Sequence, residues 1–157
     1  MFVADILTPK LVLPELDMAT KEEVLTALAE RVAACHPEID RLTLITALHK
    51  RERLLSTALS RGVAIPHARV PGVPRMVAAL GRSRDGLDCQ SQDGEPTHLF
   101  FLLVTPAEQP TLQLKMLAAA SRLLHEERCR ALLLEAENVD AMLRVLRHEE
   151  RRSRNAA

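Results

Sequence analysis

The chain has very few aromatic side chains and no excess of charge of either sign. Aromatic residues make up 2% of its 157 residues, and Trp and Tyr are absent. Proteins that bind single-stranded nucleic acids commonly stack bases on aromatic side chains, so this class of function is disfavoured. Basic and acidic residues both number 21, which gives a formal net charge of zero. The sequence therefore does not favour a polyanionic partner such as nucleic acid.

Long hydrophobic runs are also missing. The longest apolar run extends from Leu99 to Val104, which is too short to cross a bilayer and suits a buried strand. Residues 1–5 lack the basic stretch of a secretory signal. The cysteines, Cys35, Cys89 and Cys129, are odd in number and show no C-x-x-C spacing. We therefore expect a reduced, cytoplasmic protein with no direct membrane insertion.

The remaining composition is that of an ordinary globular domain, with 47% hydrophobic and 27% charged residues. Helical and strand patterns alternate along the chain, which predicts an α/β domain over residues 1–150. The mixed-charge segment 151–157 is predicted to be a frayed tail. Predicted helices begin after Thr20, at Asp40, at Pro110, near Glu126 and after Asn138, and predicted strands cover 62–65, 76–80 and 98–104.

Finer features follow from the same patterns. Asp85-Gly86 and Asp93-Gly94 are predicted to be turns. The inner face of the helix that starts at Pro110 is predicted to carry Leu114, Leu117, Ala118, Ser121 and Leu124.

One histidine follows a short apolar run and a proline, in the sequence Gly62-Val63-Ala64-Ile65-Pro66-His67. A residue that precedes proline avoids the α region, so His67 is expected just past the end of a strand. A neutral imidazole is a good nucleophile toward phosphorus, and an arginine such as Arg51 is well suited to hold phosphate oxygens. On spacing alone, a half-buried structural histidine and an arginine at a solvated helix end are the simpler interpretations.

The segment from Arg51 to His67, RERLLSTALSRGVAIPH, closely resembles the phosphorylation-site segment of type 2 enzyme IIA proteins. These proteins belong to the sugar and nitrogen-regulatory phosphotransferase systems. The resemblance implies a single domain with a mixed β-sheet flanked by α-helices. It also implies that His67 accepts a phosphoryl group from an HPr-type carrier and that Arg51 stabilises that group. Thr57, from the Ser56-Thr57 hydroxyl pair, would hydrogen-bond the imidazole or the phosphoryl group.

Two departures from the family pattern are visible. The loop residues Ala58 to Arg61 replace a segment that is commonly glycine-rich. Gln113 stands where the family usually carries a second histidine, and neither His98 nor His125 occupies an equivalent place. The Gln113 amide can donate a hydrogen bond to a phosphoryl oxygen, but it cannot titrate or carry positive charge. An ordinary surface role for Gln113 is equally compatible with the sequence.

No cofactor is expected, because the sequence shows neither a metal-ligand spacing nor a glycine-rich nucleotide loop. The resemblance leaves three outputs open. The chain could be a nitrogen-type regulator that acts on partner proteins, which we favour, or the IIA subunit of a fructose- or mannitol-type transporter that passes phosphate to a IIB component. It could also be a binding module in which phosphotransfer has decayed, as the two departures suggest.

Overall fold

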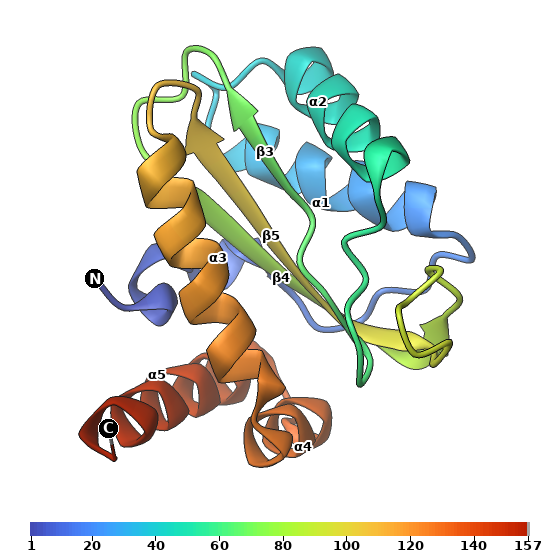
Figure 1. Ribbon diagram of the computed structural model, residues 1–157, viewed down its shortest axis with the longest axis vertical. Coiled ribbons are helices and arrows are strands. Elements are labelled where there is room, and N and C mark those ends of the chain that lie inside the picture. Colours follow the sequence, from blue (N-terminus) through green and yellow to red (C-terminus); the bar gives the residue numbers. More distant parts are fainter. Residues whose placement is uncertain (157) are drawn as a thin grey trace.

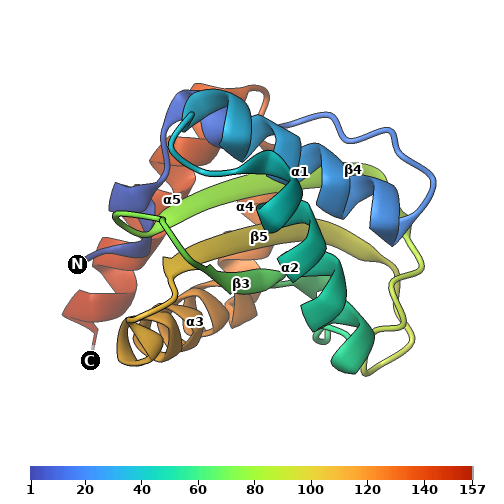
Figure 2. The ribbon, with the colours of Figure 1, turned by 90° about the horizontal axis from the view of Figure 1, so that it is seen from above.

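The computed structural model describes residues 1–156, in which helices cover both faces of one mixed β-sheet (Figures 1 and 2). This arrangement confirms the predicted fold class. The strands are β1 (Val12–Leu13), β2 (Val63–Ala64), β3 (His67–Val70), β4 (Val77–Leu87) and β5 (Thr97–Pro106). The helices are η1 (Val3–Ile6), η2 (Pro9–Leu11), α1 (Lys21–Cys35), α2 (Arg41–Leu54), α3 (Pro110–His125), α4 (Glu127–Glu135) and α5 (Val139–Asn155). None of these helices is long and apolar enough to cross a membrane.

The central strand of the sheet is β5, which is buried along almost its whole length. It pairs antiparallel with β4 on one side, and β4 in turn pairs with β1. On its other side, β5 pairs in parallel first with β2, where Ala64 lies opposite Phe100, and then with β3, where His67 lies opposite Leu103. Two short strands therefore share one edge of β5, with Ile65 and Pro66 between them.

Two apolar clusters fill the space on either side of the sheet. One contains the buried side chains of α1 and α2, and the other contains those of α3, α4 and α5. Strands β4 and β5 each contribute alternate residues to the two clusters, because successive side chains of a strand point to opposite faces. Leu102 thus belongs to one cluster and Leu103 to the other.

Helices α1 to α5 begin where they were predicted to begin. At several of these starts a local side chain satisfies a free amide group of the first turn. The Thr20 hydroxyl accepts from the Glu23 amide at 3.2 Å, and Asp40 accepts from the Thr43 amide at 2.9 Å. Asn138 caps α5 in the same way, and α3 begins at Pro110. These signals lie within a few residues of each other, which is why the sequence reveals them.

Two local predictions were wrong, and strand β3 was not predicted. Asp85-Gly86 does not end a strand: β4 continues to Leu87, and Gly86, at φ +80°, accommodates an irregularity in its pairing with β5. His67 lies just past the end of β2, as predicted, but it also begins β3, a strand that the sequence patterns did not indicate. The buried face of α3 excludes Leu114, which is 70% exposed. It consists of Met116, Ala120, Leu123 and Leu124. Apolar residues surround most of α3, so periodicity could not identify the face that the sheet covers.

The carboxyl-terminal region also differs from the frayed tail predicted for 151–157. Helix α5 extends to Asn155, and residue 157 lies outside the described residues. The carboxylate of Glu150, 5% exposed, accepts from the backbone amides of Val3 at 2.6 Å and Ala4 at 2.9 Å. Arg154 donates to the Met1 carbonyl at 2.6 Å. The charged end of the chain is therefore fixed by the start of the chain, which no local pattern could reveal.

Replacing Glu150 with Ala should lower the free energy of unfolding by about 2 kcal/mol, because two buried amide groups lose their acceptor. Urea unfolding followed by circular dichroism measures this change. Arg144→Ala, on an exposed position of α5, is the matched control and should stay within about 0.5 kcal/mol of the parent. Equal stability of the Glu150→Ala variant and the parent would contradict a structural role for this carboxylate.

Candidate functional site

The half-buried His67 begins β3 directly after Pro66, at the point where the chain passes from β2 to β3. Its Nδ1 atom lies 2.7 Å from the carbonyl oxygen of Ile65. Because a carbonyl oxygen only accepts hydrogen bonds, Nδ1 must carry the proton and donate it. The neutral ring then has its free electron pair on Nε2, which makes Nε2 the nucleophilic atom.

The surroundings of His67 favour this neutral form. Burial is the largest influence and lowers the pKa of the imidazole, since a charged ring loses solvation. The hydrogen bond to Ile65 and the charge of Glu52 raise the pKa, while the charge of Arg51 lowers it further. The net result is a pKa below the ordinary value for histidine. At neutral pH the ring is therefore uncharged and able to act as a nucleophile.

Arg51 lies in the last turn of α2, a helix that packs against β3. Its Nη1 atom donates to the Leu55 carbonyl at 2.7 Å, which holds the side chain at the end of the helix. The guanidinium is close enough to influence the pKa of His67. Arg51 and His67 are sixteen positions apart in the sequence, and the packing of α2 against β3 places them on neighbouring elements. An anion on His67 would lie within the field of a fixed positive charge.

The hydroxyl pair bonds to other groups than the histidine. Thr57 is buried, and its hydroxyl donates to Glu52 Oε2 at 2.5 Å while its amide donates to Glu52 Oε1 at 2.9 Å. The Ser56 hydroxyl donates to the Cys89 carbonyl at 2.9 Å. Both residues therefore fix the chain that leaves α2 near Arg51. In this structure they act on the shape of the site and not on the imidazole.

Glu52 is a member of the site that sequence reasoning missed. It is 8% exposed and, besides Thr57, it binds Lys21 Nζ at 3.3 Å. Its negative charge opposes that of Arg51 in setting the pKa of His67. A buried carboxylate needs partners, and these come from α1 and from the loop after α2. The mixed run His49 to Arg53 looks solvated in the sequence, so nothing local marked Glu52 as buried.

The other candidate residues occupy different ends of the fold. Gln113, half-buried, lies in the first turn of α3, which starts beyond the end of β5 (Figure 1). His98 lies near the start of β5, where its Nδ1 atom is 2.9 Å from the Ser83 carbonyl. His125 ends α3, about 18 Å along the helix from Gln113 at the usual rise per residue. Neither histidine takes the place of Gln113.

Comparison with known proteins adds independent information. The sequence model of the family described as "Phosphoenolpyruvate-dependent sugar phosphotransferase system, EIIA 2" matches residues 5–149. A nitrogen regulatory protein of Bradyrhizobium diazoefficiens is 32% identical over 92% of this chain and 94% of its own length. The fructose-specific EIIABC component of Bacillus subtilis is 32% identical over 96% of this chain. The chain spans only 24% of that longer protein.

A solved structure shows the same fold. The nitrogen regulatory protein IIA-Ntr from Neisseria meningitidis superposes with a TM-score of 0.85 at 23% identity, covering 92% of this chain and 98% of that one. At this level of identity the likeness establishes the architecture and its topology.

The titration of His67 tests the electrostatics of the site. Its pKa should lie below the value of about 6.5 for a free histidine, so the neutral form is lost only as the pH falls past that lower midpoint. Arg51→Gln should move the midpoint upward, because a positive charge that disfavours the protonated ring is removed. NMR titration of the ring protons measures both values.

Arg53→Gln is the matched control for this titration. Arg53 is exposed, lies on the same helix and belongs to the same charged run. We expect this variant to leave the midpoint unchanged. An equal shift in the two variants would mean that only the overall charge matters, and it would contradict the specific placement of Arg51.

Proposed function

We propose that this chain, which belongs to the EIIA 2 family of the phosphoenolpyruvate-dependent sugar phosphotransferase system, carries a phosphoryl group on Nε2 of His67. One observation carries the proposal: Nδ1 of His67 donates to the Ile65 carbonyl at 2.7 Å, which leaves Nε2 as the free nucleophile. The lowered pKa of the ring supports it, because a neutral imidazole is available at neutral pH. Family members are phosphotransfer carriers. We assign the carrier role in this chain to Nε2 of His67.

The transfer step follows from this arrangement. The phosphoryl donor is a phosphohistidine on an HPr-type carrier protein. Nε2 of His67 forms a bond to phosphorus as the bond from phosphorus to the donor nitrogen breaks, and the donor imidazole keeps that electron pair. Positive charge that develops on the His67 ring is stabilised by the Ile65 carbonyl, which faces Nδ1–H. Both bonds are phosphoramidates, so the reaction is readily reversible and needs neither metal nor nucleotide.

Positioning and charge compensation supply the catalysis. Arg51 is the group that would compensate the charge on the phosphoryl oxygens, because its guanidinium already acts on the ring of His67. Glu52 and Thr57 are positioning residues, since they fix the end of α2 through buried hydrogen bonds. Gln113, in the first turn of α3, would donate from its amide to a phosphoryl oxygen.

Exposed leucines close in sequence to Arg51 and Gln113 indicate where partner proteins would bind. Leu54 and Leu55, which follow Arg51, are 76% and 71% exposed, and Leu114, which follows Gln113, is 70% exposed. Exposed leucines next to proposed site residues in the sequence favour contact with another protein surface. We assign this surface to the HPr-type carrier and to the downstream protein, which is a regulatory target or a IIB component. With these partners, the chain would act in the cytoplasm.

The nitrogen-regulatory output is the one we favour. Gln113 has no titratable group and no charge, so it cannot relay a proton or neutralise a phosphoryl oxygen as a histidine could. This suits a protein that holds a phosphoryl group as a signal better than one that passes it rapidly to a transported sugar. The alternative, a IIA subunit of a fructose-type transporter, is supported by the similarity to fructose-specific proteins.

Phosphorylation is tested with the purified chain, phosphoenolpyruvate, enzyme I and an HPr-type carrier. Intact mass should show one acid-labile phosphate, and His67→Ala should abolish it. His98→Ala and His125→Ala serve as matched controls and should be labelled as the parent is. Labelling that persists in His67→Ala would overturn the assignment. No labelling with cognate carriers and a positive control would favour a binding module in which phosphotransfer has decayed.

A deletion strain separates the two branches. If the chain is a regulator, its loss should leave uptake of each phosphotransferase sugar within about twofold of the parent strain, since no transported substrate depends on it. If it serves a transporter, uptake of one sugar should fall at least tenfold. The measurement is initial uptake of radiolabelled fructose and mannitol, with complementation by the parent gene and by the His67→Ala variant.

A further inference from the structure

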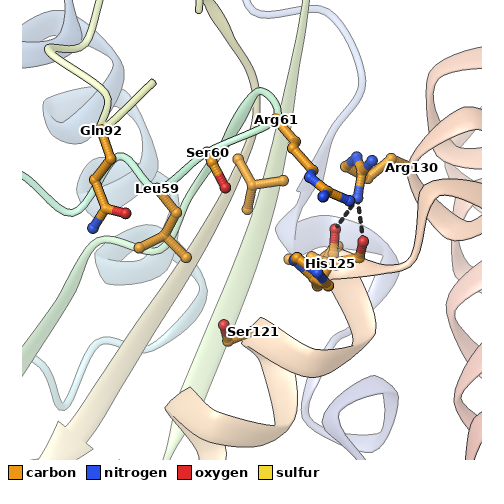
Figure 3. Close-up of a pocket in the computed structure, with 9 residues that line it drawn as sticks. Leu59, Ser60, Arg61, Gln92, Ser121, His125 and Arg130 are labelled. Carbon is orange, nitrogen blue, oxygen red and sulfur yellow. Dashed lines mark hydrogen bonds between the residues drawn. The ribbon is translucent and has the colours of Figure 1, made fainter. Parts of the chain in front are cut away.

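A polar cavity lies away from the His67 site, at the end of α3 that is remote from Gln113 (Figure 3). Its volume is about 190 Å³. Ser60 and Arg61, from the loop before β2, line it together with Gln92, from the loop before β5. The other polar lining residues are Ser121 and His125, from the last turns of α3, and Arg130, from α4. Four separate parts of the fold therefore contribute hydrogen-bonding side chains to the lining of one small space.

In the described part of the chain, two arginines and no carboxylate line the cavity. Arg61 and Arg130 both line it, and their side chains lie on the same side of the cavity in the view of Figure 3. Arg130 Nη1 donates to the Leu124 carbonyl at 3.1 Å, which fixes its guanidinium at the end of α3. Of the ion pairs formed among residues 1–156, none involves either arginine. Two guanidinium groups that share a cavity without a carboxylate favour an anion between them.

The backbone of Arg61 supports this reading. Its φ is +62°, in the left-handed region that residues other than glycine rarely adopt, and Gly62 follows with a φ of +80°. Asp93 could have neutralised Arg61, but its carboxylate accepts from the Arg61 amide at 2.8 Å and from the Glu95 amide at 3.1 Å. Asp93 thus holds the strained loop in place and leaves the guanidinium free. Strain that surrounding contacts maintain is typical of functional positions.

We infer that this cavity binds the phosphate group of a small phosphorylated molecule. Arg61 and Arg130 would hold the phosphate oxygens, and the hydroxyl groups of Ser60 and Ser121 would donate to them. The cavity is smaller than the 300–1,000 Å³ or so of drug-sized sites, which suits a ligand with one or two phosphate groups. The site needs no phosphorylation of His67, so the chain has a second input that is separate from its proposed carrier function.

Pyrophosphate and orthophosphate are the probes, titrated into the full chain in 0.15 M NaCl, where screening weakens diffuse surface binding. Isothermal titration calorimetry gives the affinity, and backbone NMR shifts should concentrate on residues 60–62, 121–125 and 130. The key variant is Arg61→Gly, because glycine adopts φ +62° without strain. It should keep or raise the melting temperature while weakening pyrophosphate binding at least tenfold.

Two matched variants separate this cavity from other positive sites. Arg51→Gln removes the arginine beside His67, and Arg69→Gln removes an exposed arginine of β3; both should bind pyrophosphate as the parent does. Loss of binding in Arg51→Gln with full binding in Arg61→Gly would place the anion at the His67 site and overturn the inference. Equal weakening in all three variants, or no binding at millimolar pyrophosphate, would overturn it as well. Labelling of His67 is a separate measurement, so either proposal can fail alone.

Discussion

The break between β2 and β3 along one edge of β5 is the constraint on which the site depends. Both short strands pair with β5, so the chain between them must pass Ile65 and Pro66 without leaving the sheet. Pro66 has no amide hydrogen to donate, but its carbonyl accepts from the Leu103 amide at 3.0 Å. The Ile65 carbonyl is left facing the ring of His67. The reactive tautomer of the histidine is therefore a consequence of how the sheet edge is built.

Buried charges join distant elements of the fold. Arg82, in β4, is fully buried, and its Nη1 atom donates to the carbonyls of Leu133 and Ala136 at 2.7 Å each. Glu150 accepts from two backbone amides near the start of the chain, and Glu52 accepts from the Thr57 backbone and hydroxyl. In each case a charge satisfies main-chain groups that would otherwise lack partners. Some of the charged residues in this neutral chain therefore join elements that are distant in the sequence.

The two ends of α3 have different electrostatic surroundings. Gln113 lies at its amino-terminal end, where helix amides favour an anion, and His67 begins the strand beside β5. At its carboxyl-terminal end the helix carbonyls would repel an anion, but Arg130 binds two of them and presents positive charge to the cavity. One helix therefore connects the proposed carrier site with the proposed phosphate cavity. A ligand in the cavity would contact the same element that supplies Gln113.

The sequence by itself determined the fold class, the helix starts and the importance of the His67 segment. Caps such as Thr20 and Asn138, and the order of residues from Arg51 to His67, act over short distances that a linear pattern records. Only the tertiary structure decided that Thr57 bonds to Glu52, that Glu150 binds backbone amides near the amino terminus, and that Arg61 and Arg130 line one cavity. These contacts join residues from separate elements, and their partners are chosen by how helices pack on the sheet. Local spacing carries no information about that packing.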